Sequence, residues 1–115
     1  MVIGVGVNER KACSRTAGER ISAIQQLYAD EPRIEVMGFS DLTVTFAKRV
    51  GAQFVIKGVR SVKDFEYERE QAEINRRLTG LETILLCAQP QLASVSSSLV
   101  RELEHFGQDV AQFLP

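Results

Sequence analysis

The residues best suited to hold phosphate groups lie in one short stretch, residues 57–68. Lys57, Gly58 and Arg60 follow an apolar run there, and a helical pattern begins at Asp64. Gly58 would let a ligand approach the backbone, while Lys57 and Arg60 could contact phosphate oxygens. The same residues also fit a solvated basic turn followed by a helix cap at Asp64, and their spacing alone leaves both interpretations open.

Two other loops could add phosphate contacts. Ser94, Ser96, Ser97 and Ser98 precede and open an amphipathic helix, whose free N–H groups and nearby hydroxyls could bind phosphate. Taken alone, a plain serine N-cap is the simpler interpretation of this segment. Lys11 lies in a polar loop after the first apolar run, where a lone lysine is usually only solvated.

The positions of these three loops, rather than any one of them, indicate the chemistry. Each follows an apolar run with the pattern of a strand, and ligands of open α/β sheets bind at the carboxyl ends of strands. Phosphoryl and nucleotidyl transfer need positioned cations and N–H donors, and little covalent chemistry from the protein. The sequence therefore predicts a phosphate-transfer site at one edge of a sheet.

Other kinds of site have little support in the sequence. His105, the one histidine, falls late in the last helix, which argues against Ser-His-Asp catalysis and histidine metal sites. No Walker A or dinucleotide-binding fingerprint occurs, and Gly4 and Gly6 lie inside a strand pattern, where we expect them to serve packing. Cys13 and Cys87 form neither a disulfide framework nor a metal site, and we expect both to be reduced thiols.

The elements that would position these loops alternate along the chain. Continuous apolar runs predict strands buried in a parallel sheet at residues 2–7, 34–39, 53–56 and 83–88. Helical spacing predicts helices at residues 16–29, 41–50 and 64–78, and a last one that starts at 96–98. Repeated strand–helix units predict one α/β domain over residues 1–115, with a doubly wound, Rossmann-like parallel sheet.

Composition and charge limit the partners. The chain is 44% hydrophobic and 25% charged, with a formal net charge of −1. These values are ordinary for a globular domain and give no electrostatic reason to expect nucleic acid or a membrane surface as a partner. The first residues lack the basic region of a signal peptide, and no apolar stretch approaches the length of a membrane span. We therefore expect a cytoplasmic protein.

Several motifs together resemble the bacterial phosphopantetheine adenylyltransferases, a family of nucleotidyltransferases. Lys57-Gly-Val-Arg60, followed by Asp64-Phe-Glu-Tyr-Glu68 and Asn75-Arg76, is similar to the family's (Arg)-Gly-(Leu/Ile)-Arg, Asp-Phe-Glu-Tyr-Glu and Asn-Arg motifs. Val95-Ser-Ser-Ser98 resembles its Ile-Ser-Ser-(Ser/Thr) motif, and Phe39-Ser-Asp-Leu42 also fits. The resemblance runs essentially end to end, and the Asp-Phe-Glu-Tyr-Glu segment is highly specific.

The resemblance implies that ATP and 4′-phosphopantetheine react, with Mg²⁺ as cofactor, to give dephospho-coenzyme A and pyrophosphate. It implies catalytic roles for Lys11 and Arg60, with Lys11 holding the attacking phosphate. It implies that Lys11, Thr43 and Lys57 bind the pantetheine substrate. It places the following residues at ATP: Gly58, Val59, Arg60, Glu68, Leu92, Ala93, Ser94, Val95, Ser96, Ser97 and Ser98. It also implies a homohexamer.

The sequence departs from the family pattern in ways that bear on activity. Lys57 stands where the family usually has arginine, so the charge is kept but the bidentate fork is lost. Leu92 replaces the usual aromatic residue. The family pattern begins with a strand and a Gly-His loop, roughly 30 residues with no counterpart in this sequence. We therefore expect a nucleotidyltransferase fold without its first strand, and impaired catalysis by this chain alone.

Two alternative functions stay open at this point. One is a non-catalytic remnant of the fold that binds a nucleotide or coenzyme A and releases no pyrophosphate. The other is a related nucleotidyltransferase that acts on a different phosphorylated substrate, such as nicotinate mononucleotide. The helix that starts with Asp64-Phe-Glu-Tyr-Glu68 argues against this second alternative, because the segment resembles the phosphopantetheine enzymes.

Overall fold

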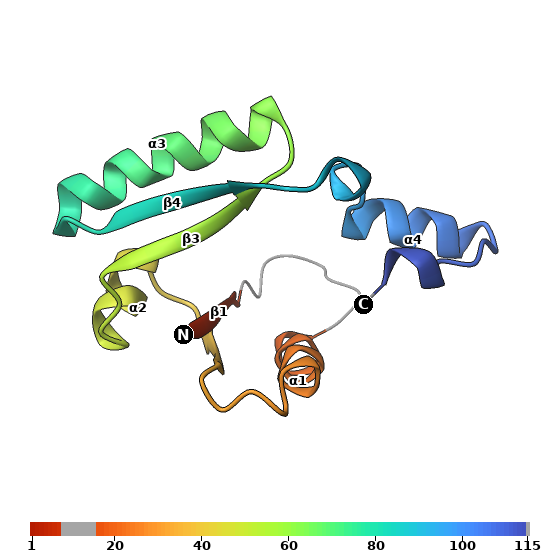
Figure 1. Ribbon diagram of the computed structural model, residues 1–115, viewed down its shortest axis with the longest axis horizontal. Helices are drawn as coiled ribbons and strands as arrows, with labels where there is room; N and C mark the ends of the chain where they lie inside the picture. Colours follow the sequence, from red (N-terminus) through yellow and green to blue (C-terminus); the bar gives the residue numbers. More distant parts are fainter. Residues whose placement is uncertain (8–15, 115) are drawn as a thin grey trace. The chain divides into compact units, whose positions relative to one another are not determined.

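The computed structural model describes residues 1–7 and 16–114 and divides into two compact units, Met1–Gln53 and Phe54–Pro115. Strands and helices alternate in both units, which confirms the predicted order (Figure 1). The first unit contains β1 (Val2–Gly6), α1 (Ala17–Leu27), β2 (Glu35–Phe39) and α2 (Thr43–Arg49). The second contains β3 (Phe54–Val59), α3 (Val62–Thr79), β4 (Glu82–Cys87), η1 (Pro90–Leu92), α4 (Ser97–His105) and η2 (Ala111–Phe113), where η marks a 3₁₀ helix.

The strands of the first unit pair in parallel, as the sequence predicts. Val2 lies opposite Glu35 and Gly6 lies opposite Phe39, so β1 and β2 are in register over their whole length. The connecting helix α1 begins where the Thr16 hydroxyl oxygen accepts a hydrogen bond from the Glu19 N–H at 3.1 Å. This contact satisfies one of the free N–H groups of the first turn, which explains the start of the helix at the predicted place.

Gly4 allows α2 to pack closely on β1. The rings of Phe39 and Phe46 stack with their centroids 4.4 Å apart. A Cβ atom at Gly4 would lie 2.7 Å from the Phe46 ring and 3.1 Å from the Phe39 ring. A side chain at position 4 would therefore displace this aromatic pair, and the packing role predicted for the glycine is confirmed.

Arg20 connects α1 to the end of β1. Its Nη2 donates a hydrogen bond to the carbonyl of Gly6, the last residue of the strand, at 3.0 Å. Its Nε is buried and has no hydrogen-bond partner among the described residues. The strand end that leads into residues 8–15 is thus held by a side chain from the first turns of the following helix.

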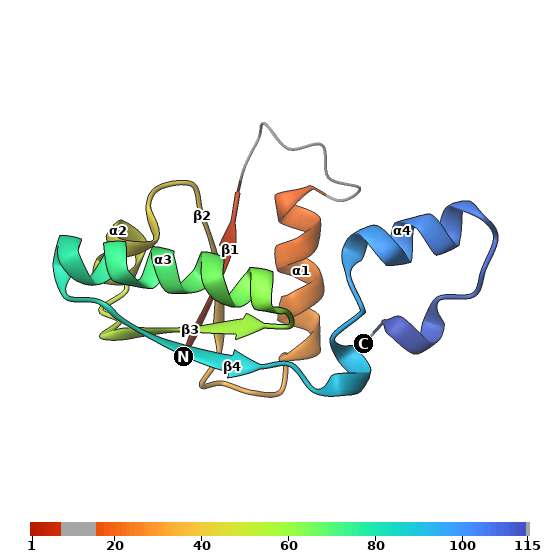
Figure 2. The ribbon, with the colours of Figure 1, turned by 90° about the horizontal axis from the view of Figure 1, so that it is seen from above.

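The second unit repeats the strand–helix–strand arrangement. β3 and β4 pair in parallel, from Phe54 opposite Glu82 to Val59 opposite Cys87, and α3 lies along this pair (Figures 1 and 2). Gly80 follows the last residue of α3 as its C-cap, where it takes a left-handed conformation with φ of 80° and donates its N–H to the Arg76 carbonyl. The parallel pairing predicted for the chain is therefore confirmed in both units.

Helix starts differ from the prediction in two places. The prediction that Asp64 caps the third helix is wrong, because the Ser61 hydroxyl oxygen caps it by accepting a hydrogen bond from the Asp64 N–H at 3.1 Å. Asp64 is instead the third residue of α3. The second helix begins at Thr43 rather than at residue 41, because Leu42 has extended backbone angles and cannot belong to the helix.

Among the described residues, none of the helices is both long enough and apolar enough to cross a membrane.

Candidate functional site

The carboxyl ends of β3 and β4 lie on the same side of their pair. α3 begins there, directly after β3, and α4 lies beyond the end of β4 (Figures 1 and 2). Two of the three segments predicted to bind phosphate, at residues 57–68 and 92–98, therefore lie in one compact unit. This juxtaposition is the one that the parallel βα pattern predicts.

Arg60 joins these two loops directly. Its Nη1 donates a hydrogen bond to the carbonyl of Val95 at 3.2 Å, across 35 positions of sequence. Its Nε forms an ion pair with the Asp64 carboxylate at 3.2 Å, and its backbone N–H donates to the same carboxylate oxygen at 3.3 Å. The guanidinium group is thus held between the start of α3 and the loop that leads into α4.

The serine segment forms the start of α4. Ser96 is the N-cap, and its hydroxyl oxygen accepts a hydrogen bond from the Leu99 N–H at 3.1 Å. Ser97 and Ser98 are the first two residues of the helix, and at this position their N–H groups lack intrahelical acceptors. Both residues are exposed. The plain N-cap interpretation therefore holds for Ser96, while Ser97 and Ser98 offer the N–H groups that bind anions at helix starts.

The residues before the serines form a tight turn. Leu92 ends the short η1 helix and is 53% exposed, and its carbonyl accepts a hydrogen bond from the Val95 N–H at 3.1 Å. Ala93 and Ser94 lie within this turn. Because both backbone groups of Val95 are engaged, by Leu92 and by Arg60, the loop approaches α4 in a fixed direction.

The side chain of Lys57 is partly exposed and contacts α3. Its Nζ lies 3.7 Å from a carboxylate oxygen of Glu68, whose side chain is 17% exposed. Since side chains alternate along a strand, Val55 and Val59 share this face of β3 with Lys57. The ammonium group therefore has a carboxylate partner in the absence of ligand, and a phosphate would have to compete with Glu68 for it.

Gly58 and Val59 offer different surfaces to a ligand. A Cβ atom at Gly58 would meet nothing within 4 Å, so the backbone there is open to a close approach. The side chain of Val59 is buried, with 5% exposure, and its carbonyl accepts a hydrogen bond from the Ala88 N–H at 2.8 Å. Any contact between Val59 and a nucleotide would therefore have to come from its backbone rather than its side chain.

Two of the predicted site residues belong to the other part of the chain. Thr43 is the first residue of α2 and is half-buried within the unit Met1–Gln53. Lys11 lies outside the described residues. The structure therefore brings together the predicted nucleotide-side residues of the second unit, while the predicted roles of Thr43 and Lys11 stay predictions.

The contacts of Asp64 and Ser61 in this site are not predicted from the sequence. The sequence predicts a helix cap at Asp64, whereas its carboxylate faces Arg60 in the structure. The spacing Ser61-x-x-Asp64 has the form of a capping box, in which a Ser is followed three residues later by an acidic residue. That pattern, placed directly after Arg60, was the signal available in the sequence.

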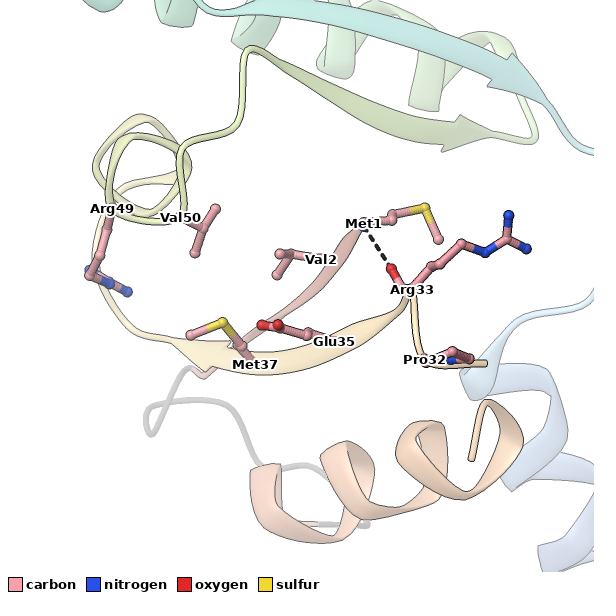
Figure 3. Close-up of a pocket in the computed structure, with 8 residues that line it drawn as sticks. All are labelled: Met1, Val2, Pro32, Arg33, Glu35, Met37, Arg49 and Val50. Atoms are coloured by element: carbon pink, nitrogen blue, oxygen red, sulfur yellow. Dashed lines mark hydrogen bonds between the residues drawn. The ribbon is translucent and has the colours of Figure 1, made fainter. Parts of the chain in front are cut away.

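A pocket in the first unit has a different character. It has a volume of about 370 Å³ and is lined by Met1, Val2, Pro32, Arg33, Glu35, Met37, Arg49 and Val50 (Figure 3). None of the site residues predicted from the sequence lines this pocket, as far as the structure describes them. Its two arginines carry acidic partners, so neither offers an unshared positive charge to a phosphate.

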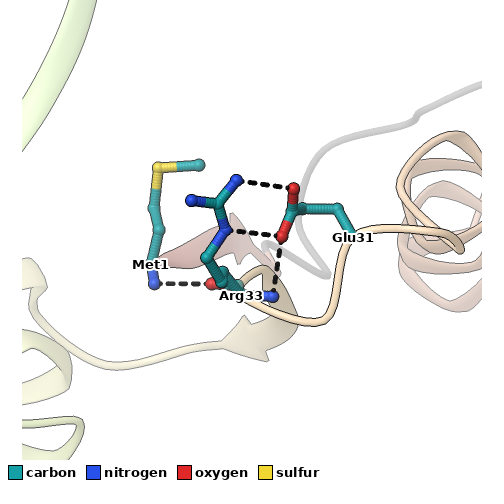
Figure 4. A network of polar contacts seen from close by, with 3 residues as sticks. All are labelled: Met1, Glu31 and Arg33. Carbon is teal, nitrogen blue, oxygen red and sulfur yellow. Dashed lines mark hydrogen bonds and ion pairs between the residues drawn. The ribbon is translucent and has the colours of Figure 1, made fainter.

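Those ion pairs shift the acidity of their carboxyl groups. Arg33 contacts Glu31 at 2.8 Å through Nε, while the Arg33 carbonyl accepts from the N-terminal ammonium of Met1 (Figure 4). The hydrogen bond from the Arg33 side chain lowers the pKa of Glu31. A hydrogen bond from Arg49 to Asp41 at 2.6 Å likewise lowers the pKa of Asp41.

Comparison with known proteins gives consistent matches over the chain. A family model described as cytidylyltransferase-like matches residues 1–103. A phosphopantetheine adenylyltransferase of Phocaeicola vulgatus is 50% identical over 115 residues, which cover 100% of this chain and 76% of that protein. Proteins of the same name from Porphyromonas gingivalis and Leuconostoc citreum are 45% and 42% identical over the whole chain, which covers 75% and 73% of their lengths.

Proposed function

This chain belongs to the cytidylyltransferase-like family and, within it, to the phosphopantetheine adenylyltransferases, and from that premise we propose that it transfers the adenylyl group of ATP to 4′-phosphopantetheine. The products are dephospho-coenzyme A and pyrophosphate. The main structural support is the hydrogen bond from Arg60 to the Val95 carbonyl. This bond places a cation beside the start of a helix, at the carboxyl ends of two parallel strands. Such an edge is where α/β sheets bind phosphorylated ligands.

The proposed reaction is a direct displacement at the α-phosphorus of ATP. A phosphate oxygen of 4′-phosphopantetheine forms the new bond to that phosphorus, and the bond to the oxygen bridging toward the β-phosphorus breaks. Pyrophosphate then leaves with the electron pair of the broken bond. The protein contributes alignment and charge stabilisation rather than a covalent intermediate.

The proposed roles divide between the two substrates. Arg60 contacts the phosphates of ATP, and the N–H groups and hydroxyls of Ser97 and Ser98 receive the phosphates that become pyrophosphate. Lys11 holds the attacking phosphate, and Thr43 and Lys57 contact the pantetheine side. Gly58, Val59, Glu68 and the turn formed by Leu92, Ala93, Ser94, Val95 and Ser96 complete the ATP side.

Mg²⁺ is proposed to arrive with the nucleotide. The described residues contain no group of three or more His, Cys, Asp or Glu side chains placed to hold a metal ion. Mg²⁺ keeps most of its water ligands and is often bound through substrate phosphates with few protein carboxylates. A protein cage is therefore not needed for the ion to neutralise charge on the triphosphate, and none of the steps above is assigned to it.

The family membership also supports proposals on assembly and location. We propose a homohexamer in the cytoplasm, as expected for the phosphopantetheine adenylyltransferases. Light scattering coupled to gel filtration would give the mass of the assembly directly. A mass equal to one chain at micromolar concentration would contradict the hexamer and leave the proposed reaction untouched.

The reaction is tested by comparing Arg60→Ala with Arg77→Ala in the protein as its gene encodes it. Both arginines pair with an acidic residue four positions away, but Arg77 bonds to Glu73 on the solvent-exposed side of α3. We expect Arg60→Ala to lower kcat/KM for pyrophosphate release on the order of a hundredfold. Arg77→Ala should stay within about twofold, as is usual for exposed surface pairs.

Two results would speak against this assignment. Equal losses of kcat/KM in Arg60→Ala and Arg77→Ala would show that Arg60 does not act on the phosphates. Binding of ATP or coenzyme A by the wild type, measured by calorimetry without any pyrophosphate release, would favour the non-catalytic alternative.

A further inference from the structure

Two ion pairs near α3 look alike but differ in what surrounds them. Arg60 and Asp64 are four residues apart with a 3.2 Å contact, and so are Glu73 and Arg77. The side chains of Glu73 and Arg77 are 67% and 79% exposed, whereas those of Arg60 and Asp64 are 46% and 33% exposed. The pair at the start of the helix is therefore more enclosed than an ordinary surface pair.

Arg60 is restrained from two directions. The Asp64 carboxylate forms an ion pair with Nε at 3.2 Å, and the Val95 carbonyl accepts a hydrogen bond from Nη1. Among the described residues, Nη2 makes no hydrogen bond. Because guanidinium is planar, fixing Nε and Nη1 also fixes the direction of the Nη2 edge. That edge remains available to an anion beside the start of α4.

Asp64 is itself restrained. Its backbone N–H donates to the Ser61 hydroxyl oxygen, and its carboxylate accepts the backbone N–H of Arg60 as well as facing Nε. The side chain is thus fixed by the first turn of α3 and by the residue that it orients. A carboxylate with these contacts is a rigid support for a flexible arginine.

We infer that Asp64 is a positioning residue, which orients Arg60 so that its Nη2 edge faces the phosphates bound at the start of α4. The inference rests on the proposed function for the identity of the anion, a nucleoside triphosphate or pyrophosphate. Asp64 does not touch the anion. It acts by removing rotamer freedom from Arg60 before binding, since ordering a flexible side chain at an interface weakens affinity by up to about tenfold.

A negative charge beside Arg60 also has an opposite effect, because it competes with the anion for the guanidinium. Replacing Asp64 by Asn separates the two effects, since the amide oxygen can still accept the backbone N–H of Arg60 and lie beside its Nε while the charge is gone. Replacing it by Ala removes both the charge and the acceptor. If orientation dominates, Asp64→Ala binds the anion more weakly than the wild type and Asp64→Asn does not.

The experiment is a calorimetric titration of the full-length protein with inorganic pyrophosphate, together with steady-state kinetics for ATP. We expect Asp64→Ala to raise the Kd for pyrophosphate and the KM for ATP by about tenfold, and Asp64→Asn to stay within about threefold of the wild type. Glu73→Ala is the matched control, because it breaks the exposed pair on the same helix. A Kd for Asp64→Ala equal to or below that of the wild type would overturn the inference.

A double-mutant cycle distinguishes orientation of Arg60 from a general effect on α3. If Asp64 acts through Arg60, Asp64→Ala should have no further effect on the Kd in the Arg60→Ala background. An undiminished effect in that background would overturn the inference. If the wild type binds pyrophosphate and shows this coupling but releases none from ATP, the proposed function fails and the positioning role stands. If the wild type does not bind pyrophosphate at all, the positioning role is refuted.

Discussion

The two basic side chains of the predicted phosphate loop are held in different ways. Arg60 has five N–H donors in a planar fork, and the protein engages two of its three nitrogens through Asp64 and Val95. Lys57 has a single ammonium group, which already lies 3.7 Å from Glu68. Arg60 can therefore keep its protein contacts while it binds an anion, whereas Lys57 must share its charge between Glu68 and a ligand.

Asp41 gives a residue-scale prediction of pH dependence. The hydrogen bond from Arg49 lowers the pKa of Asp41 below its ordinary value of 3.8 in the folded protein. The pair therefore stabilises the fold fully above pH 3.8, and this contribution is lost as the pH falls through the lowered folded value. We expect Arg49→Gln to return the pKa of Asp41 toward 3.8, as followed by NMR of its carboxyl carbon.

The control for this titration is Arg33→Gln. Arg33 lowers the pKa of Glu31 through an equivalent side-chain contact. That variant should raise the pKa of Glu31 and leave that of Asp41 unchanged. An Asp41 titration that is identical in Arg49→Gln and the wild type would show that the ion pair does not form in solution.

At the scale of elements, two glycines of one strand give a matched test of packing. A Cβ at Gly4 would lie 2.7 Å from the Phe46 ring, whereas a Cβ at Gly6 would approach the Phe39 ring only to 3.9 Å. We expect Gly4→Ala to lower the free energy of unfolding by about 1–3 kcal/mol, because the stacked rings must move. Gly6→Ala should be neutral or stabilising by up to about 1 kcal/mol, because alanine restricts the unfolded chain.

Urea denaturation followed by circular dichroism measures both glycine variants. The loss of chain entropy on replacing glycine is common to both, so the difference between them reports the clash at Gly4. Equal stabilities for Gly4→Ala and Gly6→Ala would mean that α2 does not pack on β1 as described.

Element types could be predicted from the sequence because hydrophobic periodicity and capping residues are local signals. Thr16, Ser96 and Gly51 mark helix ends that the structure has at or next to the expected positions. The start of α3 differs from the predicted one because Ser61 and Asp64 can both serve as N-caps. Only the three-dimensional structure, in which Ser61 caps the helix and Asp64 contacts Arg60, separates their roles. The bridge from Arg60 to Val95 spans 35 positions, and nothing in local spacing predicts such a contact.

At the scale of the whole molecule, residues of both units have proposed roles in the reaction. Thr43 belongs to Met1–Gln53, while Lys57, Arg60 and the serine segment belong to Phe54–Pro115. The residues assigned to ATP thus lie in the second unit. The pantetheine phosphate is assigned mainly to the first part of the chain. The proposed reaction is a single displacement between these two substrates.

The most direct test follows the label from ATP labelled at its α-phosphorus, in the protein as its gene encodes it. With 4′-phosphopantetheine present, we expect the label to appear in dephospho-coenzyme A while unlabelled pyrophosphate is released in equal amount. Nicotinate mononucleotide, offered at the same concentration, should acquire none. Label in the nicotinate product, or no transfer to 4′-phosphopantetheine from ATP that is demonstrably bound, would contradict the proposed reaction.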